Sequence, residues 1–158
     1  MRIGNLRVLT RKEIKKLKEA ILNSYGYEFN DDYVFLISEK NRVYILSPEV
    51  KNLNIDGLRI MHTGMYFCEW RDDGIRLSID GSQLIGKKLS KQVLELTDSD
   101  ILSWLAGNDI NLENYDLSAV ENSYVVIKHK NDFYGSGKLS GMKLYNYVPK
   151  ARRVNAIT

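Results

Sequence analysis

Near the start of the chain, hydrophobic residues recur at helical spacing. They fall on one helix face at Ile14, Leu17 and Ile21. Thr10 and Glu13, three residues apart, have the spacing of a capping box, which closes the first turn of a helix. Gly26 can take the left-handed conformation that commonly ends a helix. The pattern therefore predicts an amphipathic helix between Thr10 and Gly26.

Short runs of β-favouring residues follow this helix. Residues 33–38 and 42–47, separated by a polar three-residue turn, predict a β-hairpin. Three further runs follow at close spacing, at residues 58–62, 65–70 and 74–79. A short helical stretch at residues 80–85 ends at Gly86. Five short strands against one helix predict an α+β unit.

The pattern restarts after the polar segment 87–91, so we expect a boundary between residues 1–88 and residues 89–158. Thr97 opens a helix with a second capping box, and Gly107 stops it. The side chains expected to face inward from this helix are Ile101, Leu102 and Leu105.

Strands dominate the rest of this second unit. One strand is predicted at residues 93–96, before the helix. A polar loop at residues 108–122 leads to three closely spaced strands, at residues 123–129, 133–138 and 142–147. About 65 residues with one helix and four or five strands suit a small, partly closed β-barrel.

The chain has 158 residues, of which 44% are hydrophobic, enough for one or two packed domains. Its net charge of +3 says little about partners, but the charges are unevenly distributed. Residues 1–18 and residues 128–158 each hold seven basic side chains and one acidic side chain. Residues 93–127 hold seven acidic side chains and no Lys or Arg. Such blocks of charge raise the question of an anionic partner.

No grouping of residues predicts a catalytic, metal or cofactor site. His62 and His129 are isolated and lack the spacing of metal-ligand motifs. Cys68 is the lone cysteine, in an apolar run where a small buried side chain is ordinary. Gly135 and Gly137 form a GxG without the following helix that a dinucleotide loop requires. We therefore expect no enzyme activity and no cofactor.

The chain begins without the apolar run of a signal peptide. No stretch approaches the roughly 18 apolar residues of a membrane span. A single cysteine suits a reducing compartment. We expect a cytoplasmic protein without a membrane partner.

The C-terminal run, residues 137–153, interleaves five basic residues with two tyrosines and contains no acidic residue. Lys and Arg contact phosphates, while a tyrosine ring can stack on an unpaired base. If Leu144 faces the core, Lys143 and Tyr145 face outward, because side chains alternate along a strand. In an alternative interpretation, the tyrosines complete the barrel and the charges only solubilise the last strand.

Short motifs accompany the helix and strands of this second unit. They are LAGNDI at residues 105–110, VVI at 125–127, FYGSGK at 133–138 and KLYNYVPKARR at 143–153. With them, residues 93–153 resemble a PUA domain, the small pseudo-barrel of RNA-modification and ribosome-biogenesis proteins. The last motif is similar to the ending of the PUA-like regions of Sun-type RNA cytosine methyltransferases. In that family the helix-end motif and the glycine-bearing strand lead towards the RNA-facing side.

Upstream, GMYF at residues 64–67 and RLSIDGSQLIG at residues 76–86 look like the pre-PUA module of archaeal proteins of this type. The resemblance implies an α+β fold, with an N-terminal α/β pre-PUA module at residues 1–88 and a small PUA-like β pseudo-barrel at residues 89–158. A methyltransferase would need a further nucleotide-binding α/β domain, and these residues contain none. The resemblance therefore implies RNA binding without catalysis.

We expect structured RNA, either rRNA or tRNA, as the partner, in RNA modification or ribosome biogenesis. The candidates for phosphate contact are Lys138, Lys143, Lys150, Arg152 and Arg153. Tyr145 is the candidate for base stacking, and Gly107 would allow close approach to the backbone. A secondary basic face, on the first helix, holds Arg11, Lys12, Lys15, Lys16 and Lys18. The alternative function is a protein-interaction adaptor that docks an RNA-modification or ribosome-assembly protein, with a small-molecule enzyme as a third and less favoured hypothesis.

Overall fold

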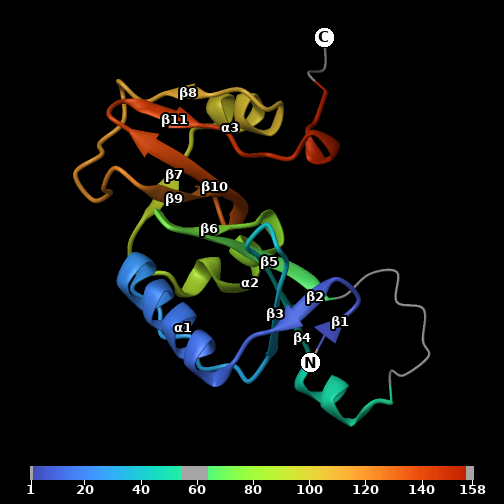
Figure 1. The fold of residues 1–158 in the computed structure, drawn as a ribbon. Helices are drawn as coiled ribbons and strands as arrows, with labels where there is room; N and C mark the ends of the chain where they lie inside the picture. The colour runs from blue at the N-terminus through green and yellow to red at the C-terminus, as the bar shows by residue number, and fades with distance from the viewer. Residues whose placement is uncertain (1, 55–63, 156–158) are drawn as a thin grey trace.

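The computed structural model describes residues 2–54 and 64–155 of the chain, and within them two β-sheets lie one above the other (Figure 1). Helices and sheets are both present, which confirms the α+β class. Short 3₁₀ helices are η1 (Pro48–Asn52), η2 (Gly86–Lys88) and η3 (Lys150–Arg152). The last of these leads to the C-terminus, beside the second sheet.

The first sheet is built from six strands that follow one another in chain order, each antiparallel to the next. They are β1 (Arg2–Ile3), β2 (Leu6–Val8), β3 (Val34–Ile37), β4 (Arg42–Leu46), β5 (Met65–Arg71) and β6 (Gly74–Leu77). The predicted hairpin is confirmed as β3 and β4. β1 and β2 were not predicted, because strands of two or three residues carry too little alternation to detect. The strand predicted at residues 58–62, with His62, lies outside the described residues.

Helix α1 (Arg11–Tyr25) packs against this sheet. It begins with the predicted capping box, in which Thr10 Oγ1 accepts from the Glu13 N–H at 3.2 Å. The Glu13 carboxylate in turn accepts from the Thr10 N–H at 2.7 Å. Gly26 ends the helix in the left-handed conformation, with a φ of 66°. The residues of α1 that are buried are Leu17, Ile21 and Tyr25.

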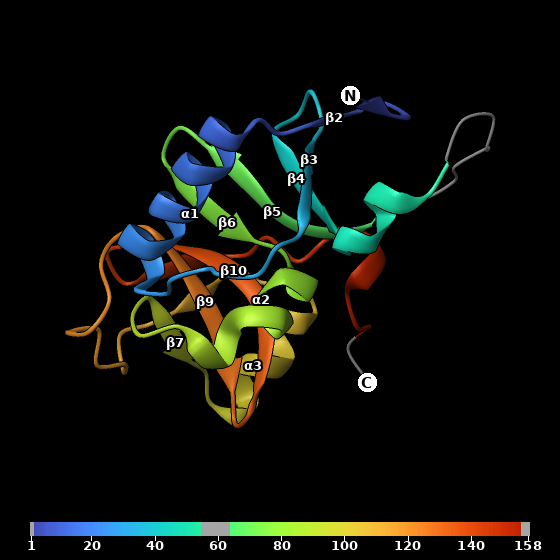
Figure 2. The ribbon, with the colours of Figure 1, turned by 90° about the horizontal axis from the view of Figure 1, so that it is seen from below.

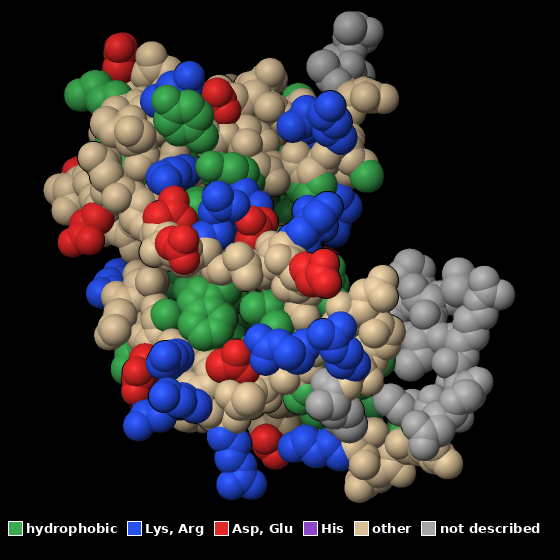
Figure 3. Space-filling model, viewed as in Figure 1, with side chains coloured by type: hydrophobic (Ala, Val, Ile, Leu, Met, Phe, Trp, Pro, Cys, Tyr) green, Lys and Arg blue, Asp and Glu red, His purple; other side chains and the backbone are tan. Residues whose placement is uncertain are grey.

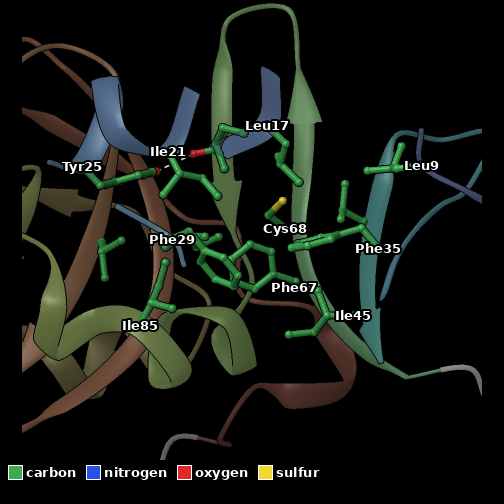
Figure 4. Close-up of a cluster of buried hydrophobic side chains, with 14 of the residues drawn as sticks. Leu9, Leu17, Ile21, Tyr25, Phe29, Phe35, Ile45, Phe67, Cys68 and Ile85 are labelled. Carbon is green, nitrogen blue, oxygen red and sulfur yellow. Dashed lines mark hydrogen bonds between the residues drawn. The ribbon is translucent and has the colours of Figure 1, made fainter. Parts of the chain in front are cut away.

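Aromatic side chains fill the space between α1 and the sheet (Figure 4). The Phe29 ring lies 5.8 Å from that of Phe35 and 5.6 Å from that of Phe67, in edge-to-face arrangements. These geometries add to the stability that burial alone provides. The buried Tyr25 hydroxyl donates a hydrogen bond to the Ile75 carbonyl of β6. This bond ties the end of α1 to the strand nearest the second sheet.

The stability that Glu13 gives to the first turn of α1 should be lost at acidic pH. Arg7 donates two hydrogen bonds to Glu13, at 2.9 and 3.0 Å, and together with the Thr10 N–H lowers the pKa of Glu13 from 4.5 to about 2. A carboxyl with a depressed folded-state pKa stabilises the fold above its unfolded pKa, and this contribution disappears as the pH falls from about 5 towards 2. An NMR titration should place the Glu13 midpoint near 2. In an Arg7→Met variant the midpoint should rise towards 4.5, and a wild-type midpoint already near 4.5 would contradict the pairing.

The second sheet has five strands in the order β7-β9-β10-β11-β8. They are β7 (Val93–Glu95), β8 (Ile110–Asn111), β9 (Tyr124–His129), β10 (Asp132–Ser140) and β11 (Lys143–Tyr145). Only the β7–β9 pair is parallel. The register of β9 and β10 shifts between Phe133 and Ser136, where Gly135 has a φ of 82°. Such a bulge bends a strand, and the sheet curls into a half-barrel (Figure 1).

Helix α3 (Asp98–Leu105) contributes to the core of this half-barrel. Ile101 is buried and Leu105 is partly buried, as predicted, but Leu102 is 69% exposed, so its predicted inward orientation was wrong. Trp104 takes the inward position instead, with no exposed surface. The reason is helical geometry, because residues 101, 104 and 105 share one face while residue 102 turns away from it. The Trp104 Nε1–H also donates to the Tyr134 carbonyl at 3.2 Å.

The predicted capping box at the start of α3 is present only in part. Thr97 Oγ1 accepts from the Asp100 N–H at 3.2 Å, as predicted. In a full capping box the Asp100 carboxylate would accept directly from the Thr97 N–H. Here Tyr115 lies between them, and its hydroxyl accepts from the Thr97 N–H at 3.0 Å and donates to Asp100 Oδ2 at 2.6 Å. Tyr115 lies in the segment 108–122, which was predicted as a loop but also contains β8. A distant residue thus completes the cap.

Helix α2 (Ile79–Ile85) joins the two sheets and contacts both β5 and β10. Ser82 Oγ accepts from the Gly135 N–H at 2.8 Å. Ser136 Oγ donates to the Leu77 carbonyl at 2.9 Å. These buried hydrogen bonds link the end of the first sheet to the bulge of the second.

Buried apolar side chains also connect the two sheets. The core around α1 continues into the second sheet through Val126 and Phe133, and Phe133 packs against Gly86. A Cβ at Gly86 would lie 2.4 Å from the Phe133 ring, so only glycine fits there. The boundary predicted at residue 88 falls at the end of η2, directly after this contact.

Candidate functional site

Strand β11 presents a basic and aromatic surface. Leu144 is fully buried, while Lys143 and Tyr145 face outward, so the predicted alternation is confirmed. The Tyr145 ring is 41% exposed, and Lys143 Nζ lies 4.7 Å from its centroid. Lys143 Nζ also lies 3.6 Å from Asp109 Oδ2, a distance that leaves the cation only loosely paired. An exposed ring beside a cation can contact both a base and a phosphate.

Lys138 lies on the neighbouring strand β10, directly opposite Tyr145 in the register. On its other side it is paired with Tyr124 of β9, and its Nζ is 5.4 Å from that ring. Its Nζ also forms a 2.7 Å ion pair with Asp73 Oδ2, from the turn between β5 and β6. Because the Tyr124 hydroxyl donates to the same carboxylate, burial and Asp73 together raise the pKa of Tyr124 to about 12. Lys138 thus pairs with a carboxylate in the turn between β5 and β6, besides lying next to Tyr145.

The three basic residues of the C-terminal segment have different surroundings. Lys150 is exposed and forms no ion pair with any described residue. Arg152 Nη1 lies 3.5 Å from Asp80 Oδ2. The Arg153 Nε–H donates to the Val148 carbonyl at 3.1 Å. Lys150 is therefore the cation of this segment that is most available to a partner.

Gly107 allows a close approach, but the group that approaches it is Arg153. Gly107 has a φ of 95°, and a Cβ there would lie 2.4 Å from Arg153 Nε. The Val154 N–H donates to the Leu105 carbonyl at 2.9 Å, which holds the segment in place beside the end of α3. The absence of a side chain at Gly107 thus leaves room for the C-terminal segment to pack against the half-barrel.

The basic face of α1 lies elsewhere. Its exposed members are Arg11, Lys12, Lys15 and Lys16. Lys18 is partly buried, because its Nζ donates to the Asp31 carbonyl at 3.4 Å and lies 5.8 Å from the Phe29 ring. In both ribbon views α1 and η3 lie on opposite sides of the molecule (Figures 1 and 2). The structure does not bring the two basic ends of the chain together.

A pocket that the sequence did not reveal lies where the two sheets meet. It has a volume of about 310 Å³. We call it the junction pocket, and its charged and aromatic walls include Arg42, Tyr66, Arg76, Tyr134, Tyr147 and Arg152. These residues come from β4, β5, β6, β10 and the C-terminal segment. No spacing along the chain relates all six, and the sequence pointed only to Tyr147 and Arg152, as members of the basic and aromatic run, and to Tyr134, in the FYGSGK motif.

The charges on the face of the protein drawn in Figure 3 are mixed. Figure 3 shows Lys and Arg side chains on both units, with Asp and Glu side chains between them. Glu69 of β5, which is 8% exposed, accepts hydrogen bonds from both Arg71 and Arg76. Glu69 thus pairs with two guanidinium groups, and Arg71 also lies 3.6 Å from Asp73 Oδ1.

The described residues contain no group of three or more His, Cys, Asp or Glu side chains that could hold a metal ion. Burial raises the pKa of the Cys68 thiol, which keeps it protonated and unreactive. His129 is partly buried at the end of β9, where its Nε2 lies 2.7 Å from Asp98 Oδ1. His129 and the Lys130 charge lower the pKa of Asp98. This pair connects β9 to the first turn of α3.

Comparison with known families assigns the C-terminal unit. Residues 91–154 match the family model described as the methyltransferase RsmF PUA domain. No curated protein matches the chain. None of the helices in the described residues is long and apolar enough to cross a membrane. Residues 91–154, with their half-barrel sheet, therefore form a PUA domain related to the PUA regions of Sun-type RNA methyltransferases.

Proposed function

We propose that this protein binds structured RNA, ribosomal or transfer RNA, and acts in RNA modification or ribosome biogenesis without catalysis of its own. PUA domains are generally RNA-binding, and the observation that carries the proposal is the exposed Lys143–Tyr145 pair on β11. Lys150 adds a cation without an ion-pair partner among the described residues, farther along the same segment. We assign residues 1–88 to a pre-PUA module that supports this domain.

Backbone contacts dominate the proposed interaction. Duplex RNA hides its base edges in a deep, narrow major groove, so a small domain reads phosphates and 2′-hydroxyl groups. Lys143 and Lys150 supply the phosphate contacts, and Tyr145 offers a ring to an unpaired base. Each phosphate contact releases counterions, which makes the affinity fall as the salt concentration rises.

A salt series with tRNA and rRNA fragments tests this proposal. A double Lys143→Ala, Lys150→Ala variant should reduce the slope of log affinity against log salt by about two, one unit for each lost phosphate contact. The matched control is Lys12→Ala, Lys16→Ala on α1, which removes the same charge from a helix outside the PUA domain, on the opposite side of the molecule from η3. Its slope should equal that of the wild type.

Two results would contradict the proposal. If both double variants changed the slope equally, the binding would depend on net charge and not on this surface. If no RNA bound and a pull-down recovered one protein in a stoichiometric complex, the adaptor function would replace RNA binding.

A further inference from the structure

The junction pocket has a composition that neither sheet could provide alone. Arg42 and Tyr66 come from the first sheet, while Tyr134 and Tyr147 come from the PUA domain. Its volume of about 310 Å³ lies at the lower end of the range of roughly 300–1,000 Å³ that is usual for small-ligand pockets. A single nucleotide suits this volume, whereas a longer oligonucleotide does not.

The charge of the walls favours an anion. Three guanidinium groups line the pocket, from Arg42, Arg76 and Arg152, and the one carboxylate that the described residues place in its walls is that of Asp80, while Arg76 is paired with Glu69 outside the walls. Arg152 and Asp80 are 3.5 Å apart, and both side chains are more than 40% exposed, so their pairing is weak. Arg42 forms no ion pair with a described residue and lies 5.6 Å from the Tyr66 ring. At least one guanidinium group is therefore available for a phosphate, which arginine binds with two parallel hydrogen bonds.

The aromatic walls favour a flat partner. The Tyr147 ring is 39% exposed, and Arg76 lies 4.1 Å from its centroid, which fixes the ring in place. Tyr124 supports the same ring from the side, with the two centroids 6.2 Å apart. The hydroxyl groups of Tyr66, Tyr134 and Tyr147 make no hydrogen bond with any described residue. These groups are available to the edge of a base or to a ribose.

We infer that the junction pocket holds one unpaired nucleotide of the bound RNA, with its base against the tyrosine rings and its phosphate at the arginines. The inference rests on the proposed RNA binding and extends it to residues of the first sheet. Stacking of a base on an aromatic side chain contributes enough to discriminate an unpaired nucleotide from a paired one. The first sheet would then help to recognise RNA, in addition to supporting the PUA domain.

The test compares two RNAs that differ by one nucleotide, a blunt duplex and the same duplex with a single bulged nucleotide, by fluorescence anisotropy. The wild type should bind the bulged duplex about tenfold more tightly than the blunt one. Arg42→Ala and Tyr147→Leu should each bring this ratio close to one. Arg42 is an exposed side chain at the start of β4, so its removal leaves the core intact. The control Lys143→Ala should weaken the binding of both RNAs and leave their ratio unchanged.

The outcomes separate this inference from the function on which it rests. If both duplexes bind equally, or if both pocket variants keep the preference, the pocket assignment is overturned while RNA binding stands. If neither duplex nor any structured RNA binds, the proposed function fails and the inference fails with it. Free mononucleotides should compete only at millimolar concentration. If free mononucleotides competed at concentrations as low as that of the bulged duplex, the pocket would bind a free nucleotide, and the inference that its nucleotide belongs to the bound RNA would be overturned.

Discussion

Replacing Trp104 with alanine should destabilise the protein by about 3–5 kcal/mol, the usual cost of removing a large aromatic side chain from a core. Trp104 is completely buried in the PUA half-barrel, where it packs near Gly137 and Leu144. The substitution leaves a cavity and also removes the donor to the Tyr134 carbonyl. That carbonyl belongs to a residue of the junction pocket, so the loss should extend to RNA binding.

Urea unfolding followed by circular dichroism measures this effect. The matched control is Leu102→Ala, two residues earlier on α3, which removes a side chain that is 69% exposed. It should change the free energy of unfolding by less than about 0.5 kcal/mol. Equal losses in the two variants would show that α3 is rotated relative to the structure, with Leu102 facing inward as the sequence pattern suggested.

The second large effect is expected from Gly81→Ala in α2. A Cβ at this position would lie 2.1 Å from the Phe67 carbonyl oxygen of β5, much closer than van der Waals contact. Backbone cannot move aside as a side chain does, so α2 must shift away from the first sheet. Overpacking of this kind typically costs 1–3 kcal/mol and occasionally more, and we expect about 3 kcal/mol.

Gln83→Ala is the control for this experiment, because it introduces alanine into the same helix at an exposed position. Its free energy of unfolding should stay within about 0.5 kcal/mol of the wild type. A Gly81→Ala variant as stable as Gln83→Ala would mean that α2 does not contact β5 as the structure has it. Since α2 also bonds the bulge of β10 through Ser82, the substitution should weaken the preference for the bulged duplex as well.

Local features of the fold could be predicted from the sequence. The start and end of α1 depend on Thr10, Glu13 and Gly26, which lie within the helix or directly beside its ends, and all three act as predicted. The cap of α3 could be predicted only in part, because Tyr115 reaches it from a distant segment. The orientation of Leu102 was wrong because apolar residues adjoin on that helix and the pattern alone did not select the buried face.

In the candidate site, too, local features could be predicted and contacts between distant segments could not. The outward orientation of Lys143 and Tyr145 depends only on strand alternation, so the sequence sufficed. The contacts of Lys138 with Asp73 and of Gly107 with Arg153 could not be predicted, because each joins residues far apart in the sequence that only the tertiary fold brings together. The junction pocket was invisible for the same reason.

The contact between Phe133 and Gly86 has a consequence for how the two units can be studied. A fragment cut at residue 88 would leave the Phe133 ring on a solvent-facing surface, together with Val126, while Ile85 would be uncovered on the other fragment. Exposed apolar side chains of this kind promote aggregation. Dissection of the chain into halves is therefore a poor route to the role of each unit, and point substitutions in the intact protein are the informative experiment.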